Sequence, residues 1–261
     1  MANRVHLWIA ATLAALSVAA CGPGVVTASP APPPSPRPSA SPASKKPRPT
    51  PVRVTYPARG HQDWTIAPAQ SGQPLGQAGR LMRYRVAVEK DIKGLPAPVF
   101  AQAVATTLGD PRGWTAGGRW RFLRVGPGQH ADFTVYLATP GTRDRLCDDN
   151  GDGYTSCRNG ASVVLNVARW VKGVPFFASA GLATYRAYMV NHEVGHRLGN
   201  GHQLCPGNGK PAPVMEQQTL GLHGCRPNPW PYPDGRLYAG RSGQYGDHAP
   251  GRDYGILATP T

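Results

Sequence analysis

The sequence is poor in acidic residues and in charge overall. Asp and Glu number 14 against 28 Lys and Arg, which gives the 261 residues a formal net charge of +14. Charged residues make up only 16% of the chain and hydrophobic residues 40%, a balance that excludes a wholly disordered protein. The positive charges are scattered and form no basic helix, which argues against nucleic-acid binding. We expect one packed domain with a generally basic surface.

The chain also lacks an apolar run long enough for an ordinary membrane-spanning helix. The run Leu7–Ala20 falls short of the roughly 20 residues that a span needs, but it follows Arg4 and suits the core of a secretory signal. Its end, Val18-Ala19-Ala20-Cys21, resembles a bacterial lipobox. We therefore predict a lipoprotein signal peptide at residues 1–20 and a lipid on Cys21 that anchors the exported protein at the outer face of the bacterial cytoplasmic membrane. A plain signal peptide on a secreted protein is the alternative.

Proline is abundant but unevenly placed. The run Ala28–Pro51 consists of Pro, Ser and Ala with interspersed Lys and Arg, a composition that cannot bury a core. We predict a disordered stalk over residues 21–60 and a folded domain over residues 61–261. On an exported protein the positive charge would attract anionic envelope polymers or lipid head groups, although a merely solvated basic surface explains it equally well.

Cysteines are few and contain no C-x-x-C pair, so a cysteine zinc site is the weaker interpretation. Apart from Cys21 there are four: Cys147, Cys157, Cys205 and Cys225. An even number in an exported protein predicts two disulfides. Proximity favours Cys147–Cys157 and Cys205–Cys225, but spacing alone does not decide among the three pairings.

Apolar periodicity predicts an α+β fold. Alternation indicates strands over 81–89, 119–125 and 131–138 and a β-rich run over 162–170, and helical patterns cover 98–108 and 179–198. Within the second helix an apolar stripe recurs at steps of three and four residues, at Ala187, Val190, Val194 and Leu198. From Cys205 onward the chain is rich in Gly, Pro and aromatic residues, and we expect irregular structure held by a disulfide.

The second helix carries a set of metal ligands. His192-Glu193-Val194-Gly195-His196 has the spacing H-E-x-x-H, and Gly199 and His202 extend it to H-E-x-x-H-x-x-G-x-x-H. Residues i and i+4 share a helix face, so His192 and His196 would present two imidazoles to one point, opposite the apolar stripe. Gly199 can adopt the left-handed conformation that ends a helix and lets the chain return with His202. Three imidazoles leave a fourth position open for water, as in catalytic zinc sites.

The extended motif resembles that of the metzincins, zinc peptidases with three His ligands, a Glu base and a later Met-containing turn. The resemblance implies a zincin-like mixed sheet, an active-site helix and a loop-rich C-terminal subdomain, with Met215 in the Met-turn. Where some metzincins carry an additional Tyr ligand, two residues after that Met, this sequence has Gln217. The stretch from about Trp64 to Tyr238 is also similar to an uncharacterised family of exported actinobacterial proteins with a predicted zincin-like domain.

These features predict a zinc endopeptidase acting on proteins or peptides of the cell envelope. One Zn²⁺ would activate a water molecule, and Glu193 would take its proton and pass it to the leaving amine. A second transition-state stabiliser is not identified: Tyr232 and His223 are candidates, although packing or surface roles suit both better. The alternatives are a non-catalytic, metal-stabilised module that binds envelope polymers, and a zinc hydrolase of cell-wall cross-link peptides.

A second metal pattern precedes the helix. The stretch 148–153 (DDNGDG) matches the D-x-N-x-D-G opening of a calcium loop. The twelfth position, where an EF-hand needs a bidentate Glu, is Asn159. A turn closed by Cys147 and Cys157 explains the Asp and Gly content without an ion, so Ca²⁺ is a secondary expectation.

Overall fold

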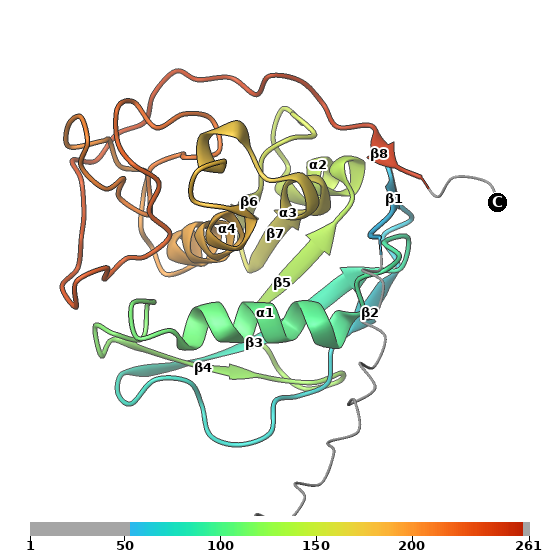
Figure 1. Cartoon of the computed structure of the whole chain (residues 1–261). Coiled ribbons are helices and arrows are strands. Elements are labelled where there is room, and N and C mark those ends of the chain that lie inside the picture. Colours follow the sequence, from blue (N-terminus) through green and yellow to red (C-terminus); the bar gives the residue numbers. More distant parts are fainter. Residues whose placement is uncertain (1–52, 258–261) are drawn as a thin grey trace, which may run out of the picture. The chain divides into compact units, whose positions relative to one another are not determined.

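A six-stranded mixed sheet lies at the centre of residues 53–257, the part of the chain that the computed structural model describes (Figure 1). Its three central strands are parallel, in the order β3 (Arg80–Glu89), β5 (Phe133–Ala138) and β7 (Ser162–Asn166). Its antiparallel outer strands are β2 (Trp64–Ile66), beside β3, and β6 (Cys157–Asn159), beside β7. A further strand, β4 (Trp120–Arg124), runs parallel to the first half of β3. The mixed sheet and its helices confirm the predicted α+β class.

The central strands are buried on both faces, which explains their nearly continuous apolar sequence. On one face, Val135 and Leu165 join the main core, and Tyr84 of β3 stacks on Phe133 of β5 with ring centroids 5.8 Å apart. On the other, a small apolar cluster contains Ala138, Val164 and Cys147. The strands predicted over 81–89 and 131–138 are confirmed as β3 and β5.

Two long helices pack against the sheet and against each other (Figure 1). Helix α1 (Ala97–Gly109) begins with Pro98 near its N-terminus, as predicted. Helix α4 (Leu182–Arg197) bears the histidine motif and contacts β6 and β7. Its predicted start at Ser179 was early, because Gly181 has a φ of 83° and a 3₁₀ turn, Pro175–Phe177, precedes it.

Two shorter helices were not predicted. The run 162–170 was expected to be β-rich throughout, but it becomes helix α3 (Val167–Lys172) because the Asn166 side chain accepts a hydrogen bond from the backbone N–H of Ala168. Helix α2 (Pro140–Cys147) packs on β6 and β7 and contains few apolar residues, so its periodicity was invisible in the sequence.

The folded part begins earlier than residue 61. Strand β1 (Tyr56–Pro57) pairs with β8 (Gly255–Ile256), and Tyr56 is only 1% exposed. The predicted stalk therefore extended too far, because the proline-rich composition continues to Pro57. The predicted signal peptide, Cys21 and residues 21–52 of the stalk lie outside the described residues. Among residues 53–257, no helix combines the length and apolar character of a membrane span.

Candidate metal centre

The motif helix α4 is buried on nearly every side over its second half. Residues 188–195 are all buried, including His192 at 5% and Glu193 at 6% exposure. The sequence predicted one packed face and one open metal-binding face. Instead, Trp114 donates a hydrogen bond to the carbonyl of Asn191 at 2.8 Å, and the Asn191 side chain donates to Pro229 at 2.9 Å. Loops from both sides therefore fix the helix that presents the histidines.

The turn after α4 returns the chain toward the helix, as the sequence predicted. Gly199 has a φ of 93°, a conformation that favours glycine. Its N–H donates to His196 at 3.1 Å, and the N–H of Asn200 donates to Gly195 at 3.0 Å. These two bonds form a Schellman motif, which satisfies the last carbonyls of the helix and directs the chain to His202.

The three imidazoles converge through the same ring atom. The Nε2 of His196 lies 3.2 Å from the Nε2 of His192 and 3.1 Å from the Nε2 of His202. The other ring nitrogen, Nδ1, faces an oxygen in each case. Nδ1 of His192 lies 2.8 Å from Val214 O, and Nδ1 of His196 lies 2.8 Å from Asn200 O. Nδ1 of His202 lies 3.0 Å from Gln244 Oε1. Because carbonyl oxygens only accept, each neutral ring carries its proton on Nδ1 and points an Nε2 lone pair at the other rings.

This donor set fits a divalent metal ion. Three facing lone pairs without a proton repel one another unless a cation lies between them. Tetrahedral zinc with bonds of 2.0–2.1 Å would separate its nitrogen ligands by about 3.3 Å, close to the distances here. Burial lowers the pKa of His192 well below its usual value and that of His196 to about 4, so both rings are neutral, as ligands must be. The predicted ligands can therefore hold one zinc ion.

Glu193 lines the same cleft as the three histidines, but its carboxyl does not belong to the cluster of metal-ligand atoms that they form. Its side chain makes no hydrogen bond within residues 53–257. Burial raises its pKa to about 8, and the positive charges of Arg143 and Arg158 oppose this rise. A cation bound by the histidines would favour the ionised form, which is the form that can act as a base.

Met215 packs directly against the motif helix. A Cβ added to Gly195 would lie 2.4 Å from Met215 Sδ and 2.8 Å from Trp114 Cζ2, so only glycine leaves space here. The preceding carbonyl, of Val214, is the acceptor for His192. The predicted Met-turn position therefore supports the helix between its two ligands.

A cleft of about 680 Å³ opens at the histidines and Glu193. One wall is the loop between α2 and β6, and another is formed by Gln244 and residues 247–249. Gln217 lines the cleft, but Tyr232 and His223 do not. Tyr232 packs against the core, and His223 pairs with Asp247 at 2.7 Å and stacks on Tyr245. The surface and packing roles thus describe these two residues better than a role at the site.

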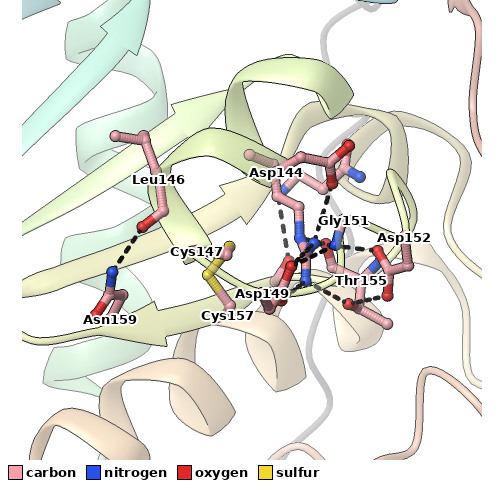
Figure 2. Close-up of a disulfide and its surroundings, with 12 residues drawn as sticks. Asp144, Leu146, Cys147, Asp149, Gly151, Asp152, Thr155, Cys157 and Asn159 are labelled. Atoms are coloured by element: carbon pink, nitrogen blue, oxygen red, sulfur yellow. Dashed lines mark hydrogen bonds and ion pairs between the residues drawn. A yellow bond between two sulfur atoms is a disulfide. The ribbon is translucent and has the colours of Figure 1, made fainter.

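The cleft-wall loop is organised around a buried arginine, Arg143. Figure 2 shows the side chains of its partners Asp144, Asp149 and Asp152 beside the Cys147–Cys157 disulfide. Arg143 is 2% exposed and bonds Asp149 in a bidentate manner at 2.7 and 2.8 Å, with Asp144 at 3.0 Å and Asp152 at 3.4 Å. The guanidinium therefore already pairs with Asp152, one of the residues that the calcium pattern takes as ligands. Asn159 instead donates to the carbonyl of Leu146 at 3.1 Å. Calcium binding stays a prediction, and the ion would have to compete with Arg143 for Asp152.

Two disulfides close the loops around the site. Cys147–Cys157 joins the end of α2 to β6, and Cys205–Cys225 joins the loop after His202 to the segment that follows Met215. The pairing favoured by proximity is confirmed. Both bonds suit an oxidising compartment outside the cell.

Sequence reasoning missed several cleft residues. Arg143, Arg158 and Gln244 all line the cleft but come from separate segments. None belongs to a local motif, so no spacing could have connected them with the histidines.

Comparison with known proteins gives a family for the chain but no activity. Residues 50–233 match the family described as Protein of unknown function (DUF3152). No curated protein and no solved structure matches.

Proposed function

We propose that this chain, which belongs to the DUF3152 family of proteins of unknown function, is a zinc-dependent endopeptidase with a metzincin-like site. The observation that carries the proposal is the convergence of three Nε2 lone pairs, at 3.1 and 3.2 Å, beside the buried carboxyl of Glu193. His192, His196 and His202 would hold the ion with three protein ligands instead of the four of a structural zinc site, which would leave room for water and suits catalysis better than a purely structural role.

The chain's own residues divide the work of peptide hydrolysis. Bound zinc would supply Lewis-acid chemistry, polarising a carbonyl group and making water more acidic. Glu193 takes the proton of the attacking water and delivers it to the leaving amine. The backbone carbonyls of Val214 and Asn200 hold the rings of His192 and His196 in the required tautomer.

A cation in the cleft wall extends the proposal to the substrate. Arg158 on β6 lines the cleft, and its side chain makes no hydrogen bond or ion pair with any other described residue, whereas the Arg143 guanidinium is fully engaged. The Tyr188 hydroxyl is also occupied, since it donates to Glu216 O at 2.9 Å. Arg158 is therefore the free donor for negative charge on a substrate. This favours, as a second candidate, peptides rich in carboxylates, such as cell-wall cross-link peptides.

The proposed location is the cell envelope. The disulfides support an exported protein. A lipid on Cys21 and a stalk would hold the domain at the outer face of the membrane, near anionic polymers that its net charge of +14 attracts.

The experiment that tests hydrolysis is a peptide-library digestion with zinc-loaded protein. We expect internal cleavage by the wild type and loss of at least a hundredfold in rate for Glu193→Gln, which removes the base but no ligand. Full activity of that variant would refute the mechanism. Zinc binding without cleavage of any peptide would instead support the non-catalytic binding module.

A further inference from the structure

The C-terminal segment Gly240–Asp253, here called the strap, contributes Gln244 and residues 247–249 to the cleft wall. Figure 1 shows it as the red trace that runs from the orange loops to β8. At its first end it pairs with the loop that carries His202: the N–H of Leu204 donates to Arg241 at 2.9 Å, and the N–H of Gly243 donates to His202 at 3.1 Å. The strap is thus hydrogen-bonded to the backbone of the third ligand.

The other end of the strap is fixed across the cleft. Arg252 donates to Gly151 O at 2.7 Å and pairs with Asp144, so it is tied to the disulfide-closed loop. Asp253 is buried and accepts from Lys172 at 2.7 Å and from Arg169 at 3.3 Å. Between these attachments, residues 247–249 line the cleft.

The strap also supplies the partner of the third imidazole. Gln244 Oε1 lies 3.0 Å from Nδ1 of His202, although the two residues are 42 positions apart. The other two rings use backbone carbonyls, Val214 O in the Met-containing turn and Asn200 O in the turn after α4. His202 alone depends on a side chain. A substitution can therefore remove this acceptor without changing the backbone.

We propose that Gln244 is a positioning residue for the third metal ligand, and that the strap completes the metal centre. An acceptor on the far ring nitrogen fixes the tautomer and the ring orientation of a ligating histidine. Gln244 lies beyond residue 233, where the family match ends, so the centre draws on a segment outside the matched region. The inference rests on the zinc site of the proposed function but not on its peptidase activity.

Zinc affinity of the full-length protein, measured by competition with a chromophoric chelator, tests this proposal. Removing such a partner typically weakens metal affinity by about 10–100-fold. The bond here is exposed, and water can replace the lost oxygen, so we expect a loss of about tenfold for Gln244→Ala. Gln244→Glu keeps an acceptor and should bind zinc at least as tightly as the wild type. The control Gln129→Ala also loses a glutamine Oε1 that accepts a hydrogen bond in a loop, here from the N–H of Gly126, and should leave affinity unchanged.

The melting temperature of the zinc-free protein separates positioning from general stability. We expect zinc-free Gln244→Ala to melt within a degree or two of the zinc-free wild type, with a smaller stabilisation on adding zinc. Unchanged zinc affinity in Gln244→Ala would overturn the proposal, as would a loss that Gln244→Glu fails to restore. If the wild type binds no zinc, the proposed function and this inference fail together. If zinc binding depends on Gln244 but no peptide is cleaved, only the proposed hydrolysis fails.

Discussion

At the scale of single residues, two buried glutamates differ in the hydrogen bonds that their carboxyl groups accept, and we expect them to differ in their effect on stability. Glu89 accepts three hydrogen bonds, from Gln62 N, Thr139 N and the Thr142 hydroxyl, at 2.6–2.9 Å. Glu216 is equally buried, yet neither of its oxygens has a hydrogen-bond partner within residues 53–257. Burial, with a smaller contribution from Asp247, raises the pKa of Glu216 to about 8. Only the oxygens of Glu89 are satisfied by hydrogen bonds.

Glu216 should make the zinc-free protein less stable as the pH rises. Its pKa is raised on folding, so its contribution is intact below about pH 4.5 and is lost as the pH rises toward about 8. We expect the free energy of unfolding, from denaturant titration, to fall across this window by a few kcal/mol. Glu216→Gln should remove about half of the decline, because burial also raises the pKa of Glu193 to about 8 and that residue contributes a similar share in the zinc-free protein. Glu89→Gln should instead destabilise at pH 8, because its amide group would face backbone donors. An equal decline in the wild type and Glu216→Gln would contradict this.

Gly195 should be the least replaceable non-ligand residue of the motif. An alanine there would drive its Cβ against Met215 Sδ and the rigid ring of Trp114. We expect Gly195→Ala to lower the free energy of unfolding by about 1–3 kcal/mol, the usual range for overpacking. Gly201→Ala is the matched control, since a Cβ there meets nothing within 4 Å. Equal stability of the two variants would show that Met215 does not pack as described.

At the scale of elements, Arg143 should govern the cleft-wall loop. It pairs with Asp144, Asp149 and Asp152 while nearly fully buried, so Arg143→Met would leave several carboxylates facing one another. Because Asp149 and Asp152 are partly exposed, we expect a loss of about 3 kcal/mol, the lower end for a broken buried pair. Faster hydrogen exchange should appear over residues 148–156. Arg145 lies on the exposed side of α2, so Arg145→Met should change neither the free energy of unfolding nor the hydrogen exchange of residues 148–156.

Local patterns in the sequence predicted the elements whose own periodicity is strong. The apolar residues of strand β3 alternate and those of helix α1 recur at helical spacing, as their packing requires. The convergence of His192 and His196 follows from their spacing of four residues on helix α4. Helix α3 depends on a single cap by Asn166, which a β-rich composition conceals. The partners of the site could not be predicted, because Gln244 and Arg158 reach it only through tertiary folding.

At the scale of the whole molecule, charge should select the substrate. A net charge of +14 attracts anionic molecules over long range, and the exposed Arg158 at the cleft wall has no side-chain hydrogen bond or ion pair within residues 53–257. For a peptide pair that differs only by a carboxylate or an amide near the scissile bond, we expect the carboxylate form to be preferred. Arg158→Ala should lower kcat/KM for that form about tenfold, the equivalent of about 1.4 kcal/mol, and leave the amide form unchanged. Equal losses for both forms would mean that Arg158 stabilises the reaction rather than selecting the substrate.

The central claim is that His192, His196 and His202 together bind one zinc ion. The most direct measurement is the metal content of the purified full-length protein, by elemental mass spectrometry after exhaustive dialysis. We predict one zinc per chain in the wild type and in Glu193→Gln, and none in His196→Ala. That variant lacks the Nε2 atom that lies 3.2 and 3.1 Å from the Nε2 atoms of His192 and His202. A wild-type protein without stoichiometric zinc, or a His196→Ala variant that retains it, would contradict the account.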